Sequence, residues 1–481
     1  MSIFTGYEPF APLSFFEQIS AVPRGSRNEA GIADWLVAFA ETRGLWVYRD
    51  AHHNVLIKKS GQHGGEKAEP LMLQGHSDIV CEKNQGTDFD FEKDGLRLKI
   101  VDGKLIADGT TLGNDDGYAM AYMLAVLDDS TIPHPPVQCL FTSMEEIGLI
   151  GAQLFDCSQI EARRLIGMDG GREGQIMIGS AGGMQIDITV PAPREAYSGA
   201  ALAIKVRGLA GGHSGALIHK GLGNANSILG RLLYRLSTAM DIRVSAISGG
   251  DKGNAIPRES DCVIALPADK LDAAKALVAE LCTELQAEFA FSDKGLYIES
   301  ETASVDSVMT ADASARCLAF QHTMPNGVVA MSRAIEGLVD SSQNFASVRT
   351  VGEELRYVLT VRSATDSRVG AVAGRIVHLA ETLGGKAACS AVYPAYTYNP
   401  VSPLREMATR LWKQLDGGDM DLQAAQGGTE LGVFSKNLPG LDIITIGPIA
   451  GGAHTPEEWV DIASFGKIYR FLLVILAELC K

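Results

Sequence analysis

The chain has 481 residues, of which 46% are hydrophobic and 21% charged, and this predicts a globular protein of two or more domains. Its net charge of −16, without clusters of basic residues, argues against a nucleic-acid partner. No segment has the ~18 apolar residues of a membrane span, and the first residues do not resemble a signal peptide. Eight cysteines without CxxC spacing indicate reduced thiols, so we expect a cytoplasmic protein without membrane association.

Strands and helices are predicted to alternate along the first part of the chain. Helical periodicity marks residues 14–22 and 28–44, and a third helix is marked by the apolar face of residues 119–127. The predicted strands are 46–50, 54–61, 70–80, 137–148 and 163–171. Near the end of the chain, residues 441–459 repeat the pattern of a buried strand followed by a glycine-rich loop. This alternation predicts an α/β domain with a central mixed sheet flanked by helices.

The middle of the chain has a different pattern. Residues 201–215 read as a strand and a turn, and residues 223–236 as a helix. Residues 254–285 and 346–383 then share a layout of polar start, alternating strand, turn and striped helix. We therefore predict an inserted α+β domain, 185–400, made of two related halves. The flanking segments, 1–184 and 401–481, would form one discontinuous domain.

Polar side chains follow the apolar strands of the predicted α/β domain. They are His76, Asp78, Glu145, Glu146, Asp169 and His454, with Asp115 in the loop before a helix. Each one alone has an ordinary structural explanation, such as a helix cap, an ion pair or a loop histidine. Together they are harder to explain, because carboxylates that meet at one sheet edge repel each other unless cations are present. Oxygen and imidazole ligands without thiolates suit Zn, Mn or Co.

These motifs resemble those of the co-catalytic zinc amidohydrolases. The segments "DGTTLGNDDG", "MEEIGLIGA", "MDGGREGQIMIGSAGG", "GGHSG" and "GGTELGVFSK" are similar to those of the aminoacyl-histidine dipeptidases within that family. The resemblance extends over nearly the whole chain. It implies a dinuclear metallo-dipeptidase that hydrolyses Xaa-His dipeptides and holds two divalent metal ions, zinc first, with cobalt or manganese as alternatives.

The resemblance also implies a role for each motif residue. The metal ligands would be His76, Asp115 as the bridge, Glu146, Asp169 and His454. Asp78 would orient His76, as the carboxylate does in carboxylate–histidine–metal triads. Two metals about 3.5–4 Å apart can acidify a shared water, so that hydroxide attacks the amide. Glu145 would be the general base, and it would return the proton to the leaving amine.

Further residues are expected at the substrate. His213 would donate to the oxyanion, although a simple turn histidine is the plainer explanation of "GGHSG". In related dimers this histidine comes from the neighbouring subunit, so we expect a homodimer joined through the inserted lid domain. By the same resemblance, Asn254 and Arg362 would hold the dipeptide's backbone and carboxylate. Gly428 and Thr429 would bound that end of the pocket.

Two other functions remain compatible with the sequence. One is a related N-acyl amino acid amidohydrolase or a broader exopeptidase. The other is an inactive binding protein on the same fold, which retention of Glu145 and of the whole ligand set argues against.

Overall fold

The computed structural model describes residues 2–481, which divide into two compact units. Of the described residues, unit 1 comprises those up to 180 together with 396–424 and 429–481, and unit 2 comprises residues 181–395 and 425–428. These limits differ by a few residues from the predicted boundaries at 184/185 and 400/401, which stay a prediction as divisions between folding domains. Among the described residues, no helix is long and apolar enough to cross a membrane.

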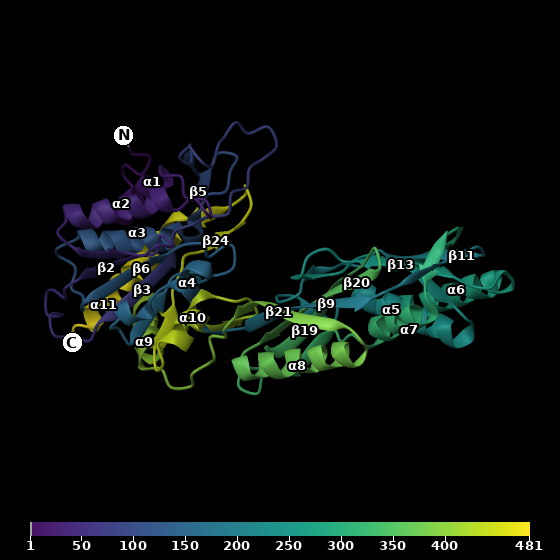
Figure 1. Ribbon diagram of the computed structural model, residues 1–481. Coiled ribbons are helices and arrows are strands. Elements are labelled where there is room, and N and C mark those ends of the chain that lie inside the picture. The colour runs from purple at the N-terminus through teal and green to yellow at the C-terminus, as the bar shows by residue number, and fades with distance from the viewer. Residues whose placement is uncertain (1) are drawn as a thin grey trace. The chain divides into compact units, whose positions relative to one another are not determined.

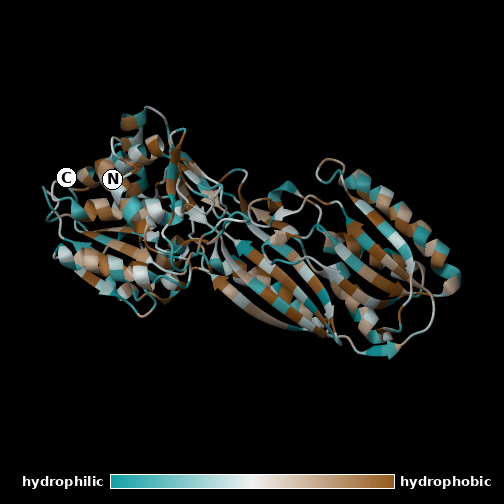
Figure 2. Cartoon of the chain, turned by 90° about the horizontal axis from the view of Figure 1, so that it is seen from above, coloured by the Kyte–Doolittle hydropathy of each residue, from teal (hydrophilic) through white to brown (hydrophobic). Residues whose placement is uncertain are grey.

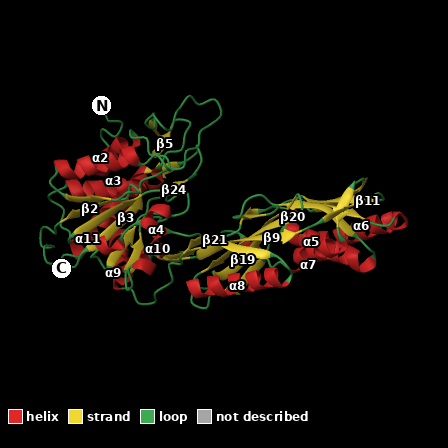
Figure 3. Cartoon of the chain, viewed as in Figure 1, coloured by secondary structure: helices red, strands yellow, loops and turns green. Residues whose placement is uncertain are grey.

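Unit 1 is built on a six-stranded mixed sheet, as predicted. The strands, in spatial order, are β1 (Trp46–Arg49), β2 (Val55–Lys59), β6 (Val137–Thr142), β3 (Leu71–His76), β7 (Arg164–Gly167) and β23 (Asp442–Thr445). β1, β2 and β6 pair antiparallel, whereas β6, β3, β7 and β23 are parallel. Every residue of β3 and β6 is buried, because helices cover both faces of the sheet (Figure 3).

The helices of unit 1 come from both ends of the chain. They are α1 (Phe10–Ser20), α2 (Ala30–Thr42), α3 (Asn114–Asp128), α4 (Ile150–Leu154), α9 (Pro403–Asp416), α10 (Glu430–Asn437) and α11 (Ile462–Glu478). Tyr122 of α3 and Phe16 of α1 both meet Phe465 of α11 edge to face, which joins the first and last segments of the chain in one core (Figure 1). The apolar end of the chain is thus a helix packed in the core of unit 1.

Smaller sheets complete unit 1. One contains β4 (Leu98–Val101), β5 (Lys104–Ala107), β25 (Trp459–Asp461) and β24 (Ala450–Gly451). The other pairs β8 (Gln175–Ser180) with β22 (Asp421–Ala425). The short strands β24 and β25 flank the loop that carries His454, and so fix that loop at both ends.

Unit 2 contains a nine-stranded sheet covered by helices. The strands, in order, are β16 (Tyr297–Ala303), β11 (Ala201–Arg207), β15 (Ser260–Ala265), β13 (Arg243–Gly249), β19 (Val339–Val351), β20 (Glu354–Ser363), β9 (Gly182–Pro191) and β21 (Lys386–Tyr393), with β18 (Gly327–Met331) beside β19. The helices are α5 (Ala225–Ala239), α6 (Leu271–Glu288), α7 (Ala311–Thr323) and α8 (Asp366–Thr382). Buried and more exposed residues alternate along β20, and Figure 2 shows alternating bands on these strands, as expected where one face packs on helices.

The two halves of this sheet have matching strand orders. From the centre outward, one half runs β13, β15, β11, β16 and the other runs β19, β20, β9, β21. In each half a helix connects the second strand to the outermost one, α6 in the first and α8 in the second. This order favours the predicted relation between two halves, which stays a prediction. Two small sheets complete unit 2, one pairing β10 (Arg194–Ala196) with β17 (Ser307–Met309) and the other pairing β12 (Gly212–His213) with β14 (Ala255–Ile256).

Candidate active site

The predicted metal ligands gather at one edge of the unit 1 sheet. β3, β6 and β7 are parallel, and their register places His76 opposite Thr142. His76 ends β3, the two glutamates follow β6, and Asp169 follows β7 by two residues. Parallel strands present their carboxyl ends together, and loops after them form the binding edge of an open α/β sheet. The apolar strand sequences therefore bring these polar groups to one place.

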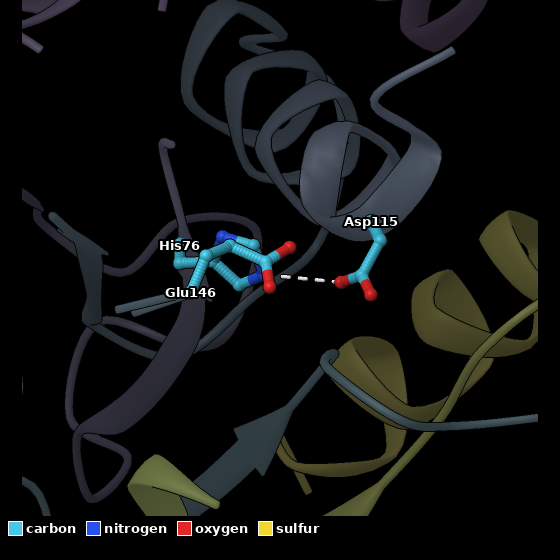
Figure 4. A group of neighbouring side chains, drawn as sticks. All are labelled: His76, Asp115 and Glu146. Atoms are coloured by element: carbon cyan, nitrogen blue, oxygen red, sulfur yellow. Dashed lines mark hydrogen bonds and ion pairs between the residues drawn. The ribbon is translucent and has the colours of Figure 1, made fainter. Parts of the chain in front are cut away.

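Asp115 lies between the two predicted histidines. Its Oδ1 lies 3.0 Å from Nε2 of His76, and its Oδ2 lies 3.4 Å from Nε2 of His454. Oε2 of Glu146 lies 3.0 Å from the same nitrogen of His454. His76, Asp115 and Glu146 also offer ligand atoms within 4.8 Å of one another, and their side chains converge in Figure 4. One carboxylate that faces two imidazoles has the form of a bridging ligand.

The adjacent glutamates sit in a turn fixed by Asp78. The backbone N–H groups of Glu145 and Glu146 donate to the two carboxylate oxygens of Asp78, at 3.0 and 3.3 Å. The main-chain oxygen of Asp78 lies 3.0 Å from Nδ1 of His76, and its carboxylate lies 3.5 Å from the same nitrogen. Asp78 therefore holds the His76 ring and the glutamate turn together. The sequence predicted only the first of these two contacts.

Burial and close pairing shift the acid–base properties of this cluster. Burial opposes protonation of His76, but hydrogen bonds to Asp115 and Asp78 raise its pKa well above the usual value. Hydrogen bonds to Asp115 and Glu146 raise the pKa of His454 to about 10. Burial, with the neighbouring Asp115, raises the pKa of Asp169 to about 7. Raised pKa values of this kind are typical of a buried cluster in which carboxylates outnumber the positive charges.

A divalent cation fits this arrangement chemically. Oε1 of Glu146 is buried and has no hydrogen-bond partner within residues 2–481, so a lone pair remains available. The donors are carboxylate oxygens and imidazole nitrogens, which suit Zn, Mn or Co. Nε2 of His76 and Nε2 of His454, each beside a carboxylate oxygen, would be the atoms that hold a metal ion, and an imidazole nitrogen that binds a metal carries no proton.

Asp116, the neighbour of Asp115, has a different role. It is fully buried, and its Oδ2 accepts a hydrogen bond of 3.2 Å from the backbone N–H of His76. Burial raises the pKa of this carboxyl well above its usual value. Asp116 thus supports the strand end beneath the site, and Asp115 is the residue that faces the histidines.

Glu458 is a site residue that the sequence did not predict. It is buried, and one carboxylate oxygen accepts the N–H groups of Leu112 and Gly113 at 2.8 and 2.9 Å. The other oxygen accepts the N–H of Asp115 at 3.1 Å. Glu458 therefore fixes the loop that presents Asp115. Its position four residues after His454 was the available signal.

His213 lies in unit 2, on the exposed end of the β12–β14 pair. Its Nδ1 accepts hydrogen bonds from the backbone N–H groups of Gly215 and Ala216, at 3.2 and 3.1 Å. Partial burial and the positive charge of Arg362 lower the pKa of this histidine. A neutral imidazole whose Nδ1 is an acceptor carries its proton on Nε2. His213 therefore presents an N–H donor.

Asn254 and Arg362 line one cavity of about 260 Å³ in unit 2. Asn254 is exposed, and its main-chain oxygen accepts the N–H of Ser214, next to His213. The Arg362 guanidinium donates to the Tyr393 hydroxyl at 2.8 Å and to the main-chain oxygen of Gln426 at 3.1 Å. The fold brings into one cavity two residues that lie in different halves of the predicted repeat.

Gly428 packs against Tyr393, and Thr429 lies beside Ser180. A Cβ at Gly428 would lie 2.5 Å from the Tyr393 ring, so only glycine fits that position in unit 2. Thr429, in unit 1, precedes α10, and its hydroxyl lies 2.8 Å from the Ser180 hydroxyl. Their predicted contact with substrate stays a prediction.

Comparison with known proteins assigns the family. Residues 72–478 match Peptidase family M20/M25/M40. The chain belongs to this family. It is 34% identical over 483 residues to the cytosol non-specific dipeptidase of Escherichia coli K12, covering 100% of this chain and 99% of that protein.

Solved structures agree with this assignment. The aminoacylhistidine dipeptidase of Vibrio alginolyticus superposes with a TM-score of 0.92 at 31% identity, covering 99% and 98% of the two chains. An aminopeptidase of Bacillus cereus shares the fold, with a TM-score of 0.57 at 16% identity over 99% and 100% of the two chains. The predicted resemblance and fold class are therefore confirmed. As a member of the M20 peptidases, the chain is an enzyme of a metal-dependent hydrolase family with a candidate metal-binding group.

Proposed function

We propose that this M20 family member is a dipeptidase that hydrolyses Xaa-His dipeptides with two divalent metal ions, zinc in preference to cobalt or manganese. The observation that carries the proposal is the position of Asp115, one oxygen toward His76 and the other toward His454. The names of the two full-length relatives, both dipeptidases, support the reaction class. The cytosolic location of the E. coli relative supports a cytoplasmic enzyme.

The metal ligands divide into two sets that share Asp115. His76 and Asp169 would complete one set, and Glu146 and His454 the other. When bound, the two metals would act as Lewis acids on a water molecule and on the scissile carbonyl. Contacts between Glu146 and His454, and between Asp115 and both histidines, support this division.

Glu145 would act as the general base. Its backbone is fixed by Asp78, and its side chain is free of the contacts that Glu146 makes to His454. Burial raises the pKa of Glu145 well above the usual value, so this carboxyl can hold a proton between its removal from water and its delivery to the leaving amine. Asp78 would orient the His76 ring and hold the turn that carries Glu145.

His213 would donate its Nε2–H to the oxyanion that forms during attack. The two backbone donors at Nδ1 support this role, because they fix the tautomer before substrate arrives. We also propose a homodimer joined through the lid domain, in which this histidine serves its own or the partner subunit's site. Asn254 and Arg362 would hold the dipeptide's backbone and carboxylate, beside Gly428 and Thr429.

A panel of substrates tests the proposal. The purified enzyme, loaded with Zn, Co or Mn in turn, is assayed with Xaa-His dipeptides, with the matching Xaa-Ala dipeptides and with N-acetyl amino acids. We expect the highest kcat/KM for Xaa-His. Equal turnover of both dipeptide sets would instead favour a broad dipeptidase, the second candidate, which the name of the E. coli relative supports. Preference for the N-acetyl compounds would overturn both.

A further inference from the structure

A short segment between α1 and α2 contacts three loops of the proposed site, those that carry His76, Asp115 and the pair Glu145 and Glu146. The segment, Arg24–Glu29, runs beside the chain just after β3, where the N–H of Ile79 donates to the Arg24 carbonyl at 3.1 Å and the N–H of Ser26 donates to the Ile79 carbonyl at 3.3 Å. It lies before residue 72, where the match to the family begins.

Arg24 joins two of the loops. Its side chain is only 1% exposed. One guanidinium nitrogen donates to the main-chain oxygen of Ser77 at 3.0 Å, and the other donates to that of Gly113 at 2.7 Å. Ser77 follows His76 directly, and Gly113 lies two residues before Asp115. One rigid fork thus fixes the distance between the loops of two proposed ligands.

Arg24 also fills the space beneath the Asp115 loop. A Cβ on Gly113 or Gly117 would lie 3.0 or 2.7 Å from its Nη2, so both glycines allow the guanidinium to approach the backbone. Burial lowers the pKa of Arg24 to about 10, which leaves the group charged at neutral pH. Its positive charge attracts the nearby carboxylates of Asp78, Asp115 and Asp116.

Ser26 and Glu29 hold the third loop. The Ser26 hydroxyl donates to Oδ2 of Asp78 at 2.8 Å, and Asp78 in turn accepts the N–H groups of Glu145 and Glu146. Glu29 is 2% exposed, and its carboxylate accepts the N–H of Met144 at 3.1 Å. The glutamate turn is therefore held from both sides.

We infer that Arg24, Ser26 and Glu29 are positioning residues, which fix the loops of His76, Asp115 and the glutamate pair in the geometry that metal binding requires. This inference rests on the proposed function for its consequence in catalysis. It assigns a role to a segment that contains none of the proposed ligands and precedes all of them in the chain.

The test compares two buried arginines of unit 1. Arg405, like Arg24, donates to two main-chain oxygens, those of Asn399 and Pro400 at 2.9 and 2.8 Å, but it lies outside the metal loops. Arg24→Met and Arg405→Met therefore remove the same kind and number of hydrogen bonds. Amide hydrogen exchange is measured on the metal-free proteins, and the metal dissociation constant is measured by competition with a chelator.

We expect faster exchange in the segments 77–79, 112–117 and 143–147 only in Arg24→Met, with metal affinity about 10–100-fold weaker, as for other groups that orient metal ligands. Its kcat should fall while KM changes less than threefold. Equal exchange in these segments in the two variants would overturn the inference. Failure of the wild-type chain to bind metal would overturn the proposed function instead, because the exchange comparison does not depend on metal.

Ser26→Ala provides a second variant that removes only one hydroxyl. It should raise exchange at the amides of Glu145 and Glu146, and Ser26→Thr, which keeps the hydroxyl, should restore it. Unchanged exchange in both Arg24→Met and Ser26→Ala would mean that the segment packs beside the site without positioning it. If Arg24→Met does not fold, the Ser26 pair decides the inference alone.

Discussion

Replacement of Glu458 by glutamine should weaken metal binding, although Glu458 is not one of the proposed metal ligands. In the native protein one carboxylate oxygen accepts two N–H groups, from Leu112 and Gly113, and the other accepts the N–H of Asp115. A glutamine has one carbonyl oxygen, which can keep the Leu112 and Gly113 pair. Its NH₂ group then faces the N–H of Asp115, donor against donor.

The energetic cost follows from these contacts. One buried N–H left without a partner costs about 1–3 kcal/mol, and the two retained bonds lose their charged acceptor. The free energy of unfolding should therefore fall by about 2–4 kcal/mol, a large part of the ~5–15 kcal/mol typical of a domain. Because the N–H that is lost belongs to Asp115, metal affinity should fall by about 10–100-fold.

Urea denaturation of the metal-free protein and chelator competition measure the two effects separately. Asp461→Asn is the matched control, since Asp461 accepts one N–H, from Ser464 at 2.8 Å, at the start of α11. It changes the net charge equally and should cost little stability, because asparagine caps a helix about as well as aspartate, and it should not reduce metal affinity. Native metal affinity in Glu458→Gln, or an equal loss in the control, would refute the reasoning.

Three further outcomes are expected. Glu145→Gln should keep its metal yet lose several orders of magnitude in kcat, because it removes the base and not a ligand; near-normal turnover with metal bound would reject that role. His213→Ala should lower kcat by about 10²–10³ with less change in KM. When His213→Ala chains are mixed with inactive Glu145→Ala chains, activity should return only if His213 reaches the partner subunit's site. Metal binding at pH 7 should release protons, because the pKa of His454 is raised to about 10 and a ligating imidazole must be neutral; identical binding heats in buffers of different ionisation enthalpy would contradict this.

The same raised pKa gives the metal-free protein a defined pH dependence. A histidine whose folded pKa exceeds its usual value contributes stability that is fully present below pH ~6.5 and is lost as the pH rises through the folded value. For His454 this window extends up to about 10. Metal affinity should change in the opposite direction, rising over the same range as the competing proton leaves.

The residues of the proposed metal site could be predicted because their chemistry is carried by side chains. His76, Glu145 and Asp169 each stand where an apolar strand turns polar, and parallel strands bring such positions together. Strands were predicted at residues 46–50 and 54–61 from the same kind of pattern, and the structure has β1 and β2 in these ranges, paired antiparallel. Residue type and strand position together contained the information that was needed.

The residues beneath the site were missed because their contacts are made to main-chain atoms. Arg24, Glu29 and Glu458 bind carbonyl or N–H groups of loops far away in the sequence. Any loop offers such groups, so no pairing of residue types marks the contact. An isolated arginine or glutamate in a polar stretch is more often solvent-exposed. Only the fold shows that these three side chains are buried.

The arrangement explains why two like charges can stand side by side after β6. The Glu146 carboxylate contacts His454, whereas the backbone N–H groups of both Glu145 and Glu146 donate to the Asp78 carboxylate. Their carboxylates nevertheless belong to a cluster of several acidic groups, which the one positive charge of Arg24 does not balance. Protons on the histidines and on buried carboxyls balance this charge when metal is absent, as the raised pKa values of His454 and Asp169 indicate. Divalent cations balance it more completely, so metal binding and the ionised state of Glu145 that a base requires should depend on each other.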